Sequence, residues 1–487
     1  MALDEIRQSR LDKLKKIKDK DINPYPSFSN RTHKIEQVLA SFDDLENSEE
    51  EVVIAGRVLA RREHGGSVFL DINDGANSIQ IYLKRDVVGD DRFNFFSETV
   101  DIGDFIEVRG TVFKTKKGEE TIQILQFGFL TKSLLPLPEK WHGLQDTEDR
   151  FRKRYLDILF NDEVRSRFKL RSKIITELRN HFIDNEFMEV DTPILHPLAG
   201  GALAKPFKTH MNDLDLDLYL RVAPELYLKR LLVGGYERVF EIGKNFRNEG
   251  MDREHNPEFT MLEAYVAYKD YNWLMNFTEE LLRSVINKTI GTTVIDSETE
   301  PINFGNKFEK IEFNDLLKKY SNIDYDNSSE EDLRAKAEEL GIVINKEMTK
   351  GIIADEIYKK VARPKIIQPT FVINHPLDIS PLAKKIEGNP THVERFQLLV
   401  DGMEVLNAFS ELNDPIDQRE RFQAQEKNRE RGDEEAHRMD EDFIEALEYG
   451  MPPAAGIGIG VDRIVKMITK APSLREVILF PTMKPQK

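Results

Sequence analysis

The chain of 487 residues is 40% hydrophobic and 32% charged, which predicts more than one domain and a sizeable core. Its formal net charge of −17 argues against a uniformly basic nucleic-acid binder, and the absence of cysteine excludes disulfides and thiolate metal sites. No apolar run reaches the length of a membrane span and MALDEIRQSR lacks a signal-peptide core, so we expect a cytoplasmic protein without a membrane partner.

Residues 1–48 are polar with a helical pattern, which predicts an N-terminal helical extension. Its segment 6–20 is basic, and a second basic stretch runs from Arg150 to Lys173. Basic patches on an acidic protein can follow a phosphate backbone. A charge run is more often a solvated helix face, and we favour that interpretation for both.

Residues 49–135 contain five short runs of β-type residues, separated by the turn-rich HGG, NDGAN and KTKKGE. The runs are VVIAGRVLA, SVFLDI, SIQIYL, DFIEVRGTV and ETIQILQF. Five short strands favour a small barrel of the OB-fold kind, which binds oligonucleotides. Alternation points Phe69 and Gln80 outward, where a ring could stack on a base and an amide could read its edge. An ordinary exposed aromatic is the alternative.

Residues 136–150, with two prolines and a glycine in KSLLPLPEKWHGL, read as a linker. Beyond it, residues 151–487 mix helix and strand patterns and predict an α+β domain. A lysine- and glutamate-rich stretch at about 300–365 reads as a helical insertion in that domain.

The segment FRNEGMDREHNPEF follows VFEIGKN and precedes TMLEAY, which predicts two antiparallel strands joined by a long loop. Alternation places Phe259, Met261, Glu263 and Tyr265 on one face, and Arg247 would lie on the partner strand. An arginine suits a phosphate, a phenylalanine suits a purine, and a glutamate accepts from an exocyclic amine. The hairpin therefore predicts an ATP site, and a plain surface hairpin is the alternative.

Two later segments add to this site. In PPAAGIGIGVDR, glycines at 456, 458 and 460 leave one strand face bare for a flat ligand, and Arg463 opens the next helix. In GMEVLNAFSELNDP, Asn407 and Glu411 share a face, but Glu404 needs a bend or bulge to join them. Two acids and an amide suit magnesium or an amine.

The ordered segments FMEVDTP (187–193), FRNE to HNPEF and GIGIGVDR resemble motifs 1, 2 and 3 of class II aminoacyl-tRNA synthetases. Their order and the barrel before them resemble the subclass that serves lysine, aspartate and asparagine. LAGGALAKPF, RVAPELYLKR, NPEFTMLEAY, ISPLAK and NAFSELNDP are most similar to bacterial-type lysyl-tRNA synthetases. The resemblance implies an OB-fold barrel followed by a catalytic domain built on an antiparallel sheet flanked by helices.

The resemblance also implies an activity, partners and roles. Lysine and ATP would give lysyl-adenylate and pyrophosphate, and the lysine would pass to the 3′ end of tRNA(Lys), in a magnesium-dependent homodimer that joins through the FMEVDTP region and binds no DNA. Arg247 and Arg463 would be catalytic, and Glu404 would ligate magnesium. The remaining ATP-binding residues would be Glu249, His255, Phe259, Gly458 and Gly460. Lysine would bind Gly200, Glu225, Arg247, Glu263, Tyr265, Asn407 and Glu411. The anticodon would bind Arg61, Phe69, Gln80 and Glu119.

The chain departs from the family pattern at Gln397, where a second acid is usual, at Glu186, where glycine is usual, and at Lys205, where arginine is usual. An aspartyl or asparaginyl enzyme is one alternative, but its pocket would need a cation where this chain has acids. A paralogue that ligates lysine to a protein would lack the barrel. A catalytically silent tRNA-binding protein would have lost Arg247 or Arg463. Formation of diadenosine polyphosphates is left open.

Overall fold

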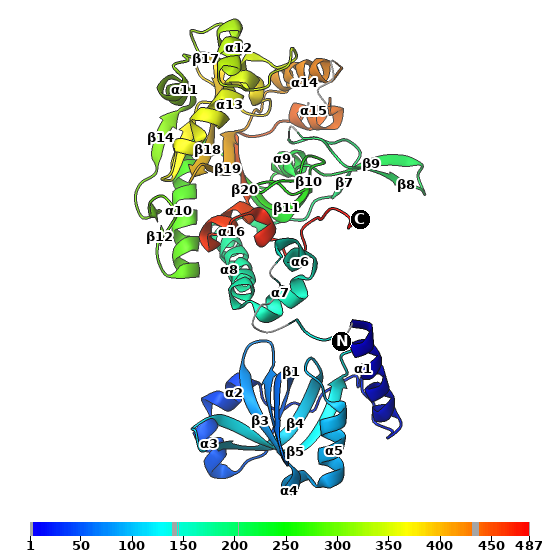
Figure 1. Cartoon of the computed structure of the whole chain (residues 1–487). Helices are drawn as coiled ribbons and strands as arrows, with labels where there is room; N and C mark the ends of the chain where they lie inside the picture. Colours follow the sequence, from blue (N-terminus) through cyan, green and yellow to red (C-terminus); the bar gives the residue numbers. More distant parts are fainter. Residues whose placement is uncertain (1–2, 139–143, 145, 203, 431–437, 487) are drawn as a thin grey trace. The chain divides into compact units, whose positions relative to one another are not determined.

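The computed structural model describes residues 3–138, 144, 146–202, 204–430 and 438–486 (Figure 1). They fold as two compact units, one made of residues 1–147 with 155–161 and the other of residues 148–154 with 162–487. The linker expected at 136–150 lies partly outside the described residues, and helix α6 (Thr147–Arg152) already begins within it. No helix among the described residues is long and apolar enough to cross a membrane.

The first unit is a closed five-stranded barrel in the order β1-β2-β3-β5-β4, as predicted. Only β3 and β5 pair in parallel. The inward residues of the alternating strands are fully buried, and closure leaves no free sheet edge. The barrel is built from β1 (Val52–His64), β2 (Ser67–Asn73), β3 (Ser78–Lys84), α4 (Arg85–Val88), α5 (Asp90–Thr99), β4 (Phe105–Lys114) and β5 (Glu120–Thr131).

The N-terminal extension is part of this unit rather than a separate arm. It consists of α1 (Leu3–Lys18), α2 (Ile35–Ala40) and α3 (Phe42–Ser48), and residues between α1 and α2 are not helical. Ile17, Ile35 and Phe42 pack into the barrel core. Arg10 is buried and donates to the carbonyl oxygens of Ile102, Ser133 and Leu135. The basic side chains of α1 therefore help to dock the helix on the barrel.

The second unit is built on an eight-stranded sheet in the order β14-β15-β18-β19-β20-β11-β10-β6. It is antiparallel except at β14–β15 and β10–β6. The strands are β6 (Met188–Glu189), β10 (Arg238–Phe246), β11 (Glu258–Ala267), β14 (Glu309–Glu312), β15 (Thr370–Ile373), β18 (Arg395–Val400), β19 (Met403–Ser410) and β20 (Ala454–Gly460).

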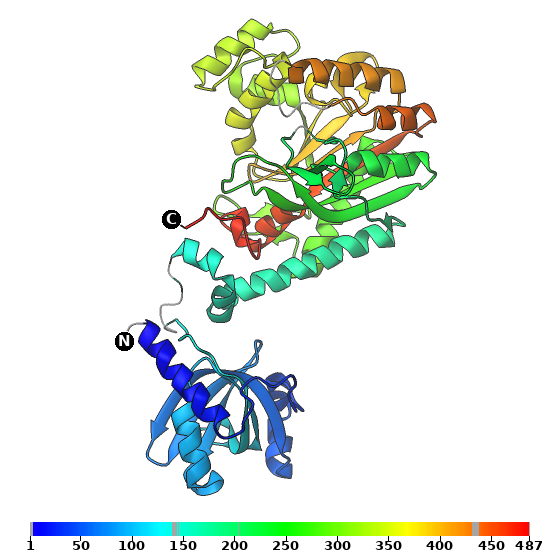
Figure 2. The same ribbon diagram turned by 90° about the vertical axis from the view of Figure 1, so that its right-hand side faces the viewer.

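Helices cover both faces of this sheet. On one face the long α8 (Asp162–Asp184), which Figure 2 shows lying along the sheet, packs with α10 (Tyr271–Ile290) and α16 (Val461–Thr469) over the main core. On the other face lie α9 (Glu225–Val233), α14 (Pro415–Glu430) and α15 (Glu441–Glu448). Smaller elements are α7 (Arg154–Phe160), β7 (Leu195–His196), β8 (Lys208–Met211), β9 (Leu216–Leu220), β12 (Val294–Ile295), β13 (Ile302–Asn303), β16 (Lys385–Ile386), β17 (Asn389–Val393), η1 (Arg363–Lys365), η2 (Leu377–Ile379) and η3 (Leu474–Glu476).

The helical insertion is narrower than the expected 300–365. Its helices are α11 (Phe313–Ser321), α12 (Glu330–Glu339) and α13 (Lys350–Val361), whereas β14 before them belongs to the main sheet. The helices share one core with Val372 and Leu399 of the sheet. Because helix α13 covers β15 and β18, the insertion packs against the same sheet that carries the site.

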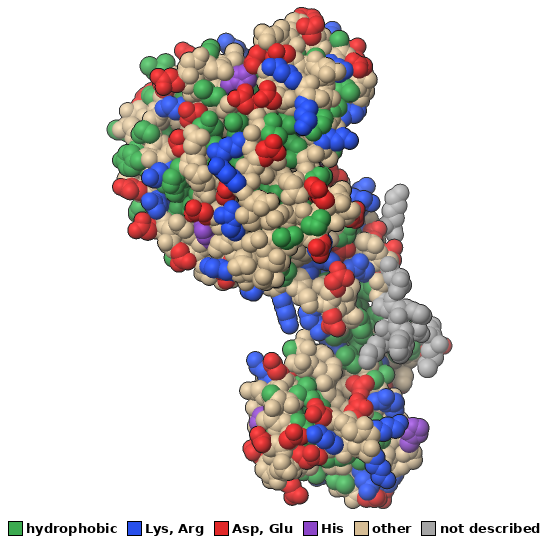
Figure 3. Space-filling model, turned by 90° about the vertical axis from the view of Figure 1, so that its left-hand side faces the viewer, with side chains coloured by type: hydrophobic (Ala, Val, Ile, Leu, Met, Phe, Trp, Pro, Cys, Tyr) green, Lys and Arg blue, Asp and Glu red, His purple; other side chains and the backbone are tan. Residues whose placement is uncertain are grey.

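Arginines of the basic stretch from Arg150 to Lys173 form ion pairs with acidic residues of the protein. Arg167 Nη1 lies 2.9 Å from Glu476 Oε2, and Arg171 Nη1 lies 2.6 Å from Asp462 Oδ1. On the face shown in Figure 3, side chains of both signs are interspersed over each unit. Arg167 is buried, so the expectation of a solvated helix face is wrong for this part of the stretch, which instead holds elements of the fold together.

Candidate active site

A cavity of about 330 Å³ opens on the α9 side of the sheet, and every segment predicted to form the site lines it. Motif 2 contributes the hairpin of β10 and β11, which are antiparallel as expected. The glycine strand β20 pairs with β11 on one side and with β19 on the other. The ends of α9 and residues 379–383 close the cavity.

The glycines of β20 form the cavity floor. Gly458 lies opposite Glu263 and Gly456 lies opposite Tyr265. A Cβ atom on Gly456 would overlap Glu411 Oε1 and the Tyr265 ring, and one on Gly458 would lie 3.1 Å from Met261 Cε. Ile457 and Ile459 pack into the core behind. Only glycine leaves this floor open, as the alternation predicted.

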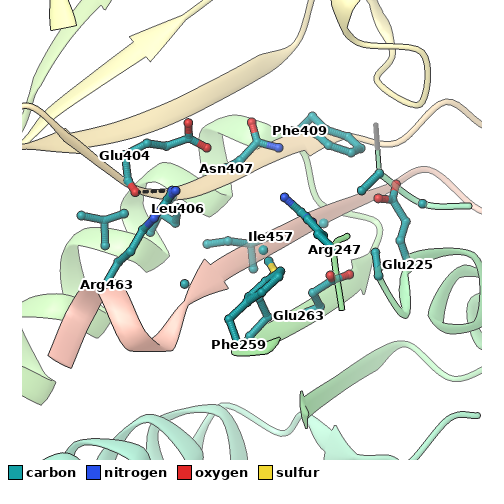
Figure 4. A pocket seen from close by; sticks show the side chains of 18 of the residues that line it. Glu225, Arg247, Phe259, Glu263, Glu404, Leu406, Asn407, Phe409, Ile457 and Arg463 are labelled. Atoms are coloured by element: carbon teal, nitrogen blue, oxygen red, sulfur yellow. Dashed lines mark hydrogen bonds between the residues drawn. The ribbon is translucent and has the colours of Figure 1, made fainter. Parts of the chain in front are cut away.

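Two arginines line the cavity, and Arg247 lies between Arg463 and the carboxylates of Glu225 and Glu263 (Figure 4). The Arg247 guanidinium lies over the Phe259 ring, 5.1 Å from its centroid, and its Nε has no hydrogen-bond partner among the described residues. Arg463 Nη1 donates to the Glu404 carbonyl oxygen at 2.8 Å. Burial, together with Arg463, lowers the pKa of Arg247. An arginine guanidinium suits a phosphate, because its forked donors form paired charge-assisted hydrogen bonds.

The end of the cavity away from Arg463 is rich in buried carboxylates. Glu225, Glu263 and Glu411 are all buried, and the Tyr265 hydroxyl donates to Glu263 Oε2 at 3.1 Å. Burial, with a contribution from Glu225, raises the pKa of Glu263 to about 8. Burial also raises the pKa values of Glu225 and Glu411, and nearby Lys229 opposes the shift. A cationic ligand would restore ionisation of these groups.

A β-bulge brings Glu404 onto the same face as Asn407. The register of β18 and β19 shifts between Leu398 and Leu399, which leaves Val405 as the additional residue on β19. Glu404 and Asn407 then both line the cavity. Asn407 Oδ1 accepts from Arg395 Nε at 2.8 Å, which leaves its amide nitrogen free to donate to a ligand. The bend that the sequence required is therefore this bulge.

Glu404, a carboxylate of the cavity lining, is the candidate metal ligand. Gln397 Nε2 donates to Glu404 Oε2 at 3.2 Å, and the Tyr358 hydroxyl contacts Gln397 Oε1 at 3.4 Å. The described residues contain no cluster of three acidic, histidine or cysteine side chains placed for a metal. One carboxylate at the phosphate end fits Mg²⁺, which commonly takes one or two carboxylates and fills its other positions with phosphate oxygens and water.

The chain matches known families over most of its length. Residues 146–484 match the family described as tRNA synthetases class II (D, K and N), and residues 52–128 match the OB-fold nucleic acid binding domain. The lysine–tRNA ligases of Pelotomaculum thermopropionicum and Carboxydothermus hydrogenoformans are each 49% identical to it, covering 100% and 99% of this chain and 96% and 99% of their own. That of Moorella thermoacetica is 48% identical over 100% of this chain and 99% of its own.

The chain belongs to the lysine–tRNA ligase family of class II synthetases.

Within this class II fold, most of the predicted site residues meet at one cavity. Arg247, Glu249, His255, Phe259, Glu263, Tyr265, Glu225, Glu404, Asn407, Gly458, Gly460 and Arg463 all line it. Glu411 Oε1 lies on the cavity side of Gly456, where a side chain at that position would overlap it. Gly200 does not line the cavity: its neighbour Gly201 does, with a φ of +90° and a Cβ position 3.1 Å from Glu225 Cβ. Gly201 is therefore the glycine of this segment that lines the cavity.

The anticodon-binding residues expected in a synthetase barrel lie on two different faces. Phe69 stacks on Tyr82 with ring centroids 4.5 Å apart, and Gln80 accepts from Thr121 Oγ1 at 3.1 Å. Arg61 instead pairs with inward Leu70, and its guanidinium donates to the carbonyl oxygens of Val100 and Ser97. A register shift between Val58 and Ala60 turns Arg62 to the face of Phe69, its direct partner.

On the same unit, Glu119 lies at the turn before β5, and its backbone amide donates to Thr115 Oγ1. Tyr82 lies opposite Phe69 on the paired strand but was not assigned to the site from the sequence. Its stacking on Phe69 makes it the second ring of an aromatic platform.

Two cations near the cavity, the half-buried Arg395 and the fully buried Lys229, were missed from the sequence. Arg395 holds Asn407, and Lys229 lies between Glu225 and Glu411. RVAPELYLKR places Lys229 one helical turn after Glu225, which was the available signal. Nothing in the sequence indicates that its ammonium turns inward.

Proposed function

We propose that the chain activates L-lysine with ATP and transfers it to tRNA(Lys). The lysine carboxylate attacks the α-phosphorus of ATP in line, and pyrophosphate leaves. The 3′-terminal ribose hydroxyl of the tRNA then attacks the acyl carbon, and AMP leaves. The observation that carries the proposal is one cavity that two arginines line together with the buried carboxylates of Glu225 and Glu263, with Glu411 at its floor.

At the ATP end the residues mainly position and neutralise charge. We assign the α-phosphate and the lysine carboxylate to Arg247, and the exocyclic amine of adenine to Glu249. Phe259 and Arg463 would hold the ring between them, over the floor of Gly458 and Gly460. His255, which lines the cavity and whose Nδ1 lies 2.9 Å from Asp252, is assigned to the outer phosphates. Mg²⁺ held through Glu404 would neutralise phosphate charge.

At the lysine end, Glu225 with Gly201 would take the α-amino group. Glu411, Glu263 and Tyr265 would take the ε-ammonium, and Asn407 would donate to the carboxylate. An aspartate side chain here would face three buried acids, a cost of several kcal/mol on the scale of unpaired buried charge. Lysine is favoured over aspartate for this reason.

The proposal includes a homodimer formed through motif 1. Strand β6 lies at the edge of the sheet and pairs only with β10 among the described residues. Met188, Ile194, Leu195 and Ile183 near it are exposed large apolar residues. A cluster of this kind at an open edge supports association with a second copy. Sedimentation of the wild type and of Met188→Glu tests this: a dimer that dissociates in the variant is the expected outcome.

The barrel would bind the anticodon in the cytoplasm, where tRNA is charged. Phe69, Tyr82 and Gln80 would contact bases, and Arg62 would replace Arg61 as the cation on that face. Glu119 remains assigned to the same role. The supporting observation is the half-buried aromatic pair on the outer surface of the barrel.

The first experiment is amino-acid-dependent ATP–pyrophosphate exchange, screened over all twenty amino acids with Mg²⁺ and without tRNA. Exchange with lysine alone is the expected result. Exchange with aspartate or asparagine would overturn the pocket assignment but keep the class. No exchange with folded protein would overturn the activation step. Loss of exchange in Arg247→Ala, with an unchanged melting temperature, tests the catalytic assignment.

A further inference from the structure

Lys229 is a fully buried residue of the protein, beside the pocket that we assign to the substrate lysine. It lies on α9 one turn after Glu225, and its side chain has no exposed surface. Its Nζ lies 2.5 Å from Glu225 Oε1 and contacts Glu411 Oε2. The rings of Phe409 and Tyr265 lie 5.4 Å and 6.0 Å from Nζ. The ammonium is thus enclosed by two carboxylates and aromatic faces.

Each of the two carboxylates engages Lys229 through one oxygen. Glu411 Oε1, the oxygen that does not contact Lys229, has no hydrogen-bond partner among the described residues. It lies on the cavity side of Gly456, where a Cβ atom would overlap it. Glu225 lines the cavity on the other side of Lys229. A buried, unpartnered carboxylate oxygen next to an open cavity is an acceptor for a ligand ammonium.

The charges around Lys229 match the two ammonium groups of lysine. When ionised, Glu225, Glu263 and Glu411 carry three negative charges, and Lys229 carries one positive charge. Two negative charges remain, and lysine brings an α-ammonium and an ε-ammonium. The lysine carboxylate is directed to Arg247 at the other end. Without Lys229, Glu411 would lose the cation with which it forms its ion pair among the described residues.

We propose that Lys229 is a positioning residue that ties Glu225 and Glu411 together and so sets the distance between the acceptors for the two ends of lysine. This inference rests on the proposed function. Neither carboxylate can move without breaking its ion pair with the same ammonium. Without this tie the two acceptors can move relative to each other, so discrimination between lysine and ornithine, which has one methylene fewer, should fall.

Lys229 also opposes protonation of the acids beside it. The groups that face this cluster are Arg395 toward Glu225, Glu263 and Tyr265 from β11, and Arg221 and Arg247 toward Glu263. Burial raises the pKa of Glu411, and Lys229 is the main influence that lowers it. Replacing Lys229 with a neutral residue therefore shifts ionisation of the acceptors to higher pH.

The test compares Lys229→Gln and Lys229→Arg in the full chain by ATP–pyrophosphate exchange. For Lys229→Gln we expect the KM for lysine to rise at least ten-fold and the KM for ATP to change less than two-fold. The preference for lysine over ornithine should fall, and the acid limb of kcat/KM for lysine should move to higher pH. Lys229→Arg keeps the charge but changes the spacing, so its acid limb should stay while its preference for lysine changes.

The matched control is Lys288→Gln, which removes an exposed lysine that lies 3.6 Å from Glu177 on the far face of the sheet and should change none of these values. Equal increases in both KM values, or an unchanged lysine preference and pH profile in Lys229→Gln, would overturn the inference. If Lys229→Gln does not fold, an unchanged preference in Lys229→Arg would do so. A wild type that fails to exchange with lysine would instead overturn the proposed function.

Discussion

The Glu411 carboxylate fills the space that a side chain on residue 456 would need. A Cβ atom on Gly456 would overlap Glu411 Oε1, so the carboxylate reaches the cavity only because residue 456 has no side chain. The glycine and the acid are 45 positions apart in the sequence, and β19 and β20 bring them together through their pairing. The floor and the lysine acceptor are therefore one structural feature.

Gly456→Ala should abolish lysine activation without unfolding the protein. The added methyl group displaces Glu411 or Tyr265, and a displacement of about 1 Å in a site of this kind can reduce rates about 100-fold. Pyrophosphate exchange measures the loss in kcat/KM for lysine. Gly128→Ala is the control, because a Cβ there meets nothing within 4 Å. Near-normal exchange by Gly456→Ala would contradict the assigned floor.

Lysine binding should release protons near neutral pH. The pKa of Glu263 is raised to about 8 by burial, so much of this carboxyl is protonated in the free protein at pH 7. The ammonium of lysine favours the ionised form, so affinity should rise with pH up to about 8, by at most about ten-fold per pH unit for one proton. Calorimetry in two buffers of different ionisation enthalpy detects the release, which Glu263→Gln should reduce.

The same carboxyl links stability to pH in the absence of ligand. Because its pKa is about 8 in the folded state and the ordinary value is 4.5, the folded state binds the extra proton between these values. The free energy of unfolding should therefore fall as pH rises from 4.5 to 8 through this group. Lysine should offset the loss, so the rise in melting temperature on adding lysine should be larger at pH 8 than at pH 6.

The motif 2 loop is attached to α16 by an ion pair between Glu254 and Lys466. A backbone hydrogen bond from Leu474 N to Arg253 O at 2.9 Å attaches the same loop to η3. The side chains are 39% and 17% exposed, so the pair should contribute about 0.5–1 kcal/mol to ATP binding by holding the loop that carries His255. Lys466→Gln should raise the KM for ATP about two- to five-fold and leave the KM for lysine unchanged.

A double-mutant cycle with Glu254→Gln separates this coupling from the effect of either charge alone. Additive effects of the two substitutions on the KM for ATP would show that the ion pair does not act on the loop.

Glu186→Gly should stabilise the catalytic unit slightly. Glu186 follows α8 in the left-handed region, with φ at +66°, where glycine has no steric cost. It is exposed and lies 3.3 Å from Arg238, an ion pair of small value at the surface. The net gain should be about 0.5 kcal/mol, visible as a higher melting temperature. Asn185→Gly, whose φ is not positive, should lower that temperature instead.

Substitutions of Arg62 and Arg61 should affect different properties, tRNA charging for Arg62 and barrel stability for Arg61. Arg62→Ala and Phe69→Ala should weaken charging of tRNA(Lys) about ten-fold or more at limiting tRNA, with pyrophosphate exchange unchanged. Arg61→Ala should instead lower the stability of the barrel, because its guanidinium holds the carbonyl oxygens at the end of α5. A charging defect in Arg61→Ala without loss of stability would restore the original assignment.

The strands and the faces of the cavity follow from the sequence. Alternation identified the buried residues of β2 and β3 and the shared face of Phe259, Glu263 and Tyr265, because a regular strand turns successive side chains to opposite sides. The bare face of β20 follows for the same reason. Residue chemistry and order were then enough to predict an ATP site and to indicate the family.

Only the tertiary structure decided where regular alternation fails and which charges meet. The bulge at Val405 turns Glu404 toward Asn407, and the shift after Val58 turns Arg62 rather than Arg61 to the outer face. One additional residue in a strand turns every following side chain to the opposite face of the sheet. Whether a strand can take such a residue depends on its register with the partner strand. Lys229 reaches Glu411 across 182 positions of sequence because burial encloses an ammonium where opposite charges surround it, and that arrangement exists only in the folded chain.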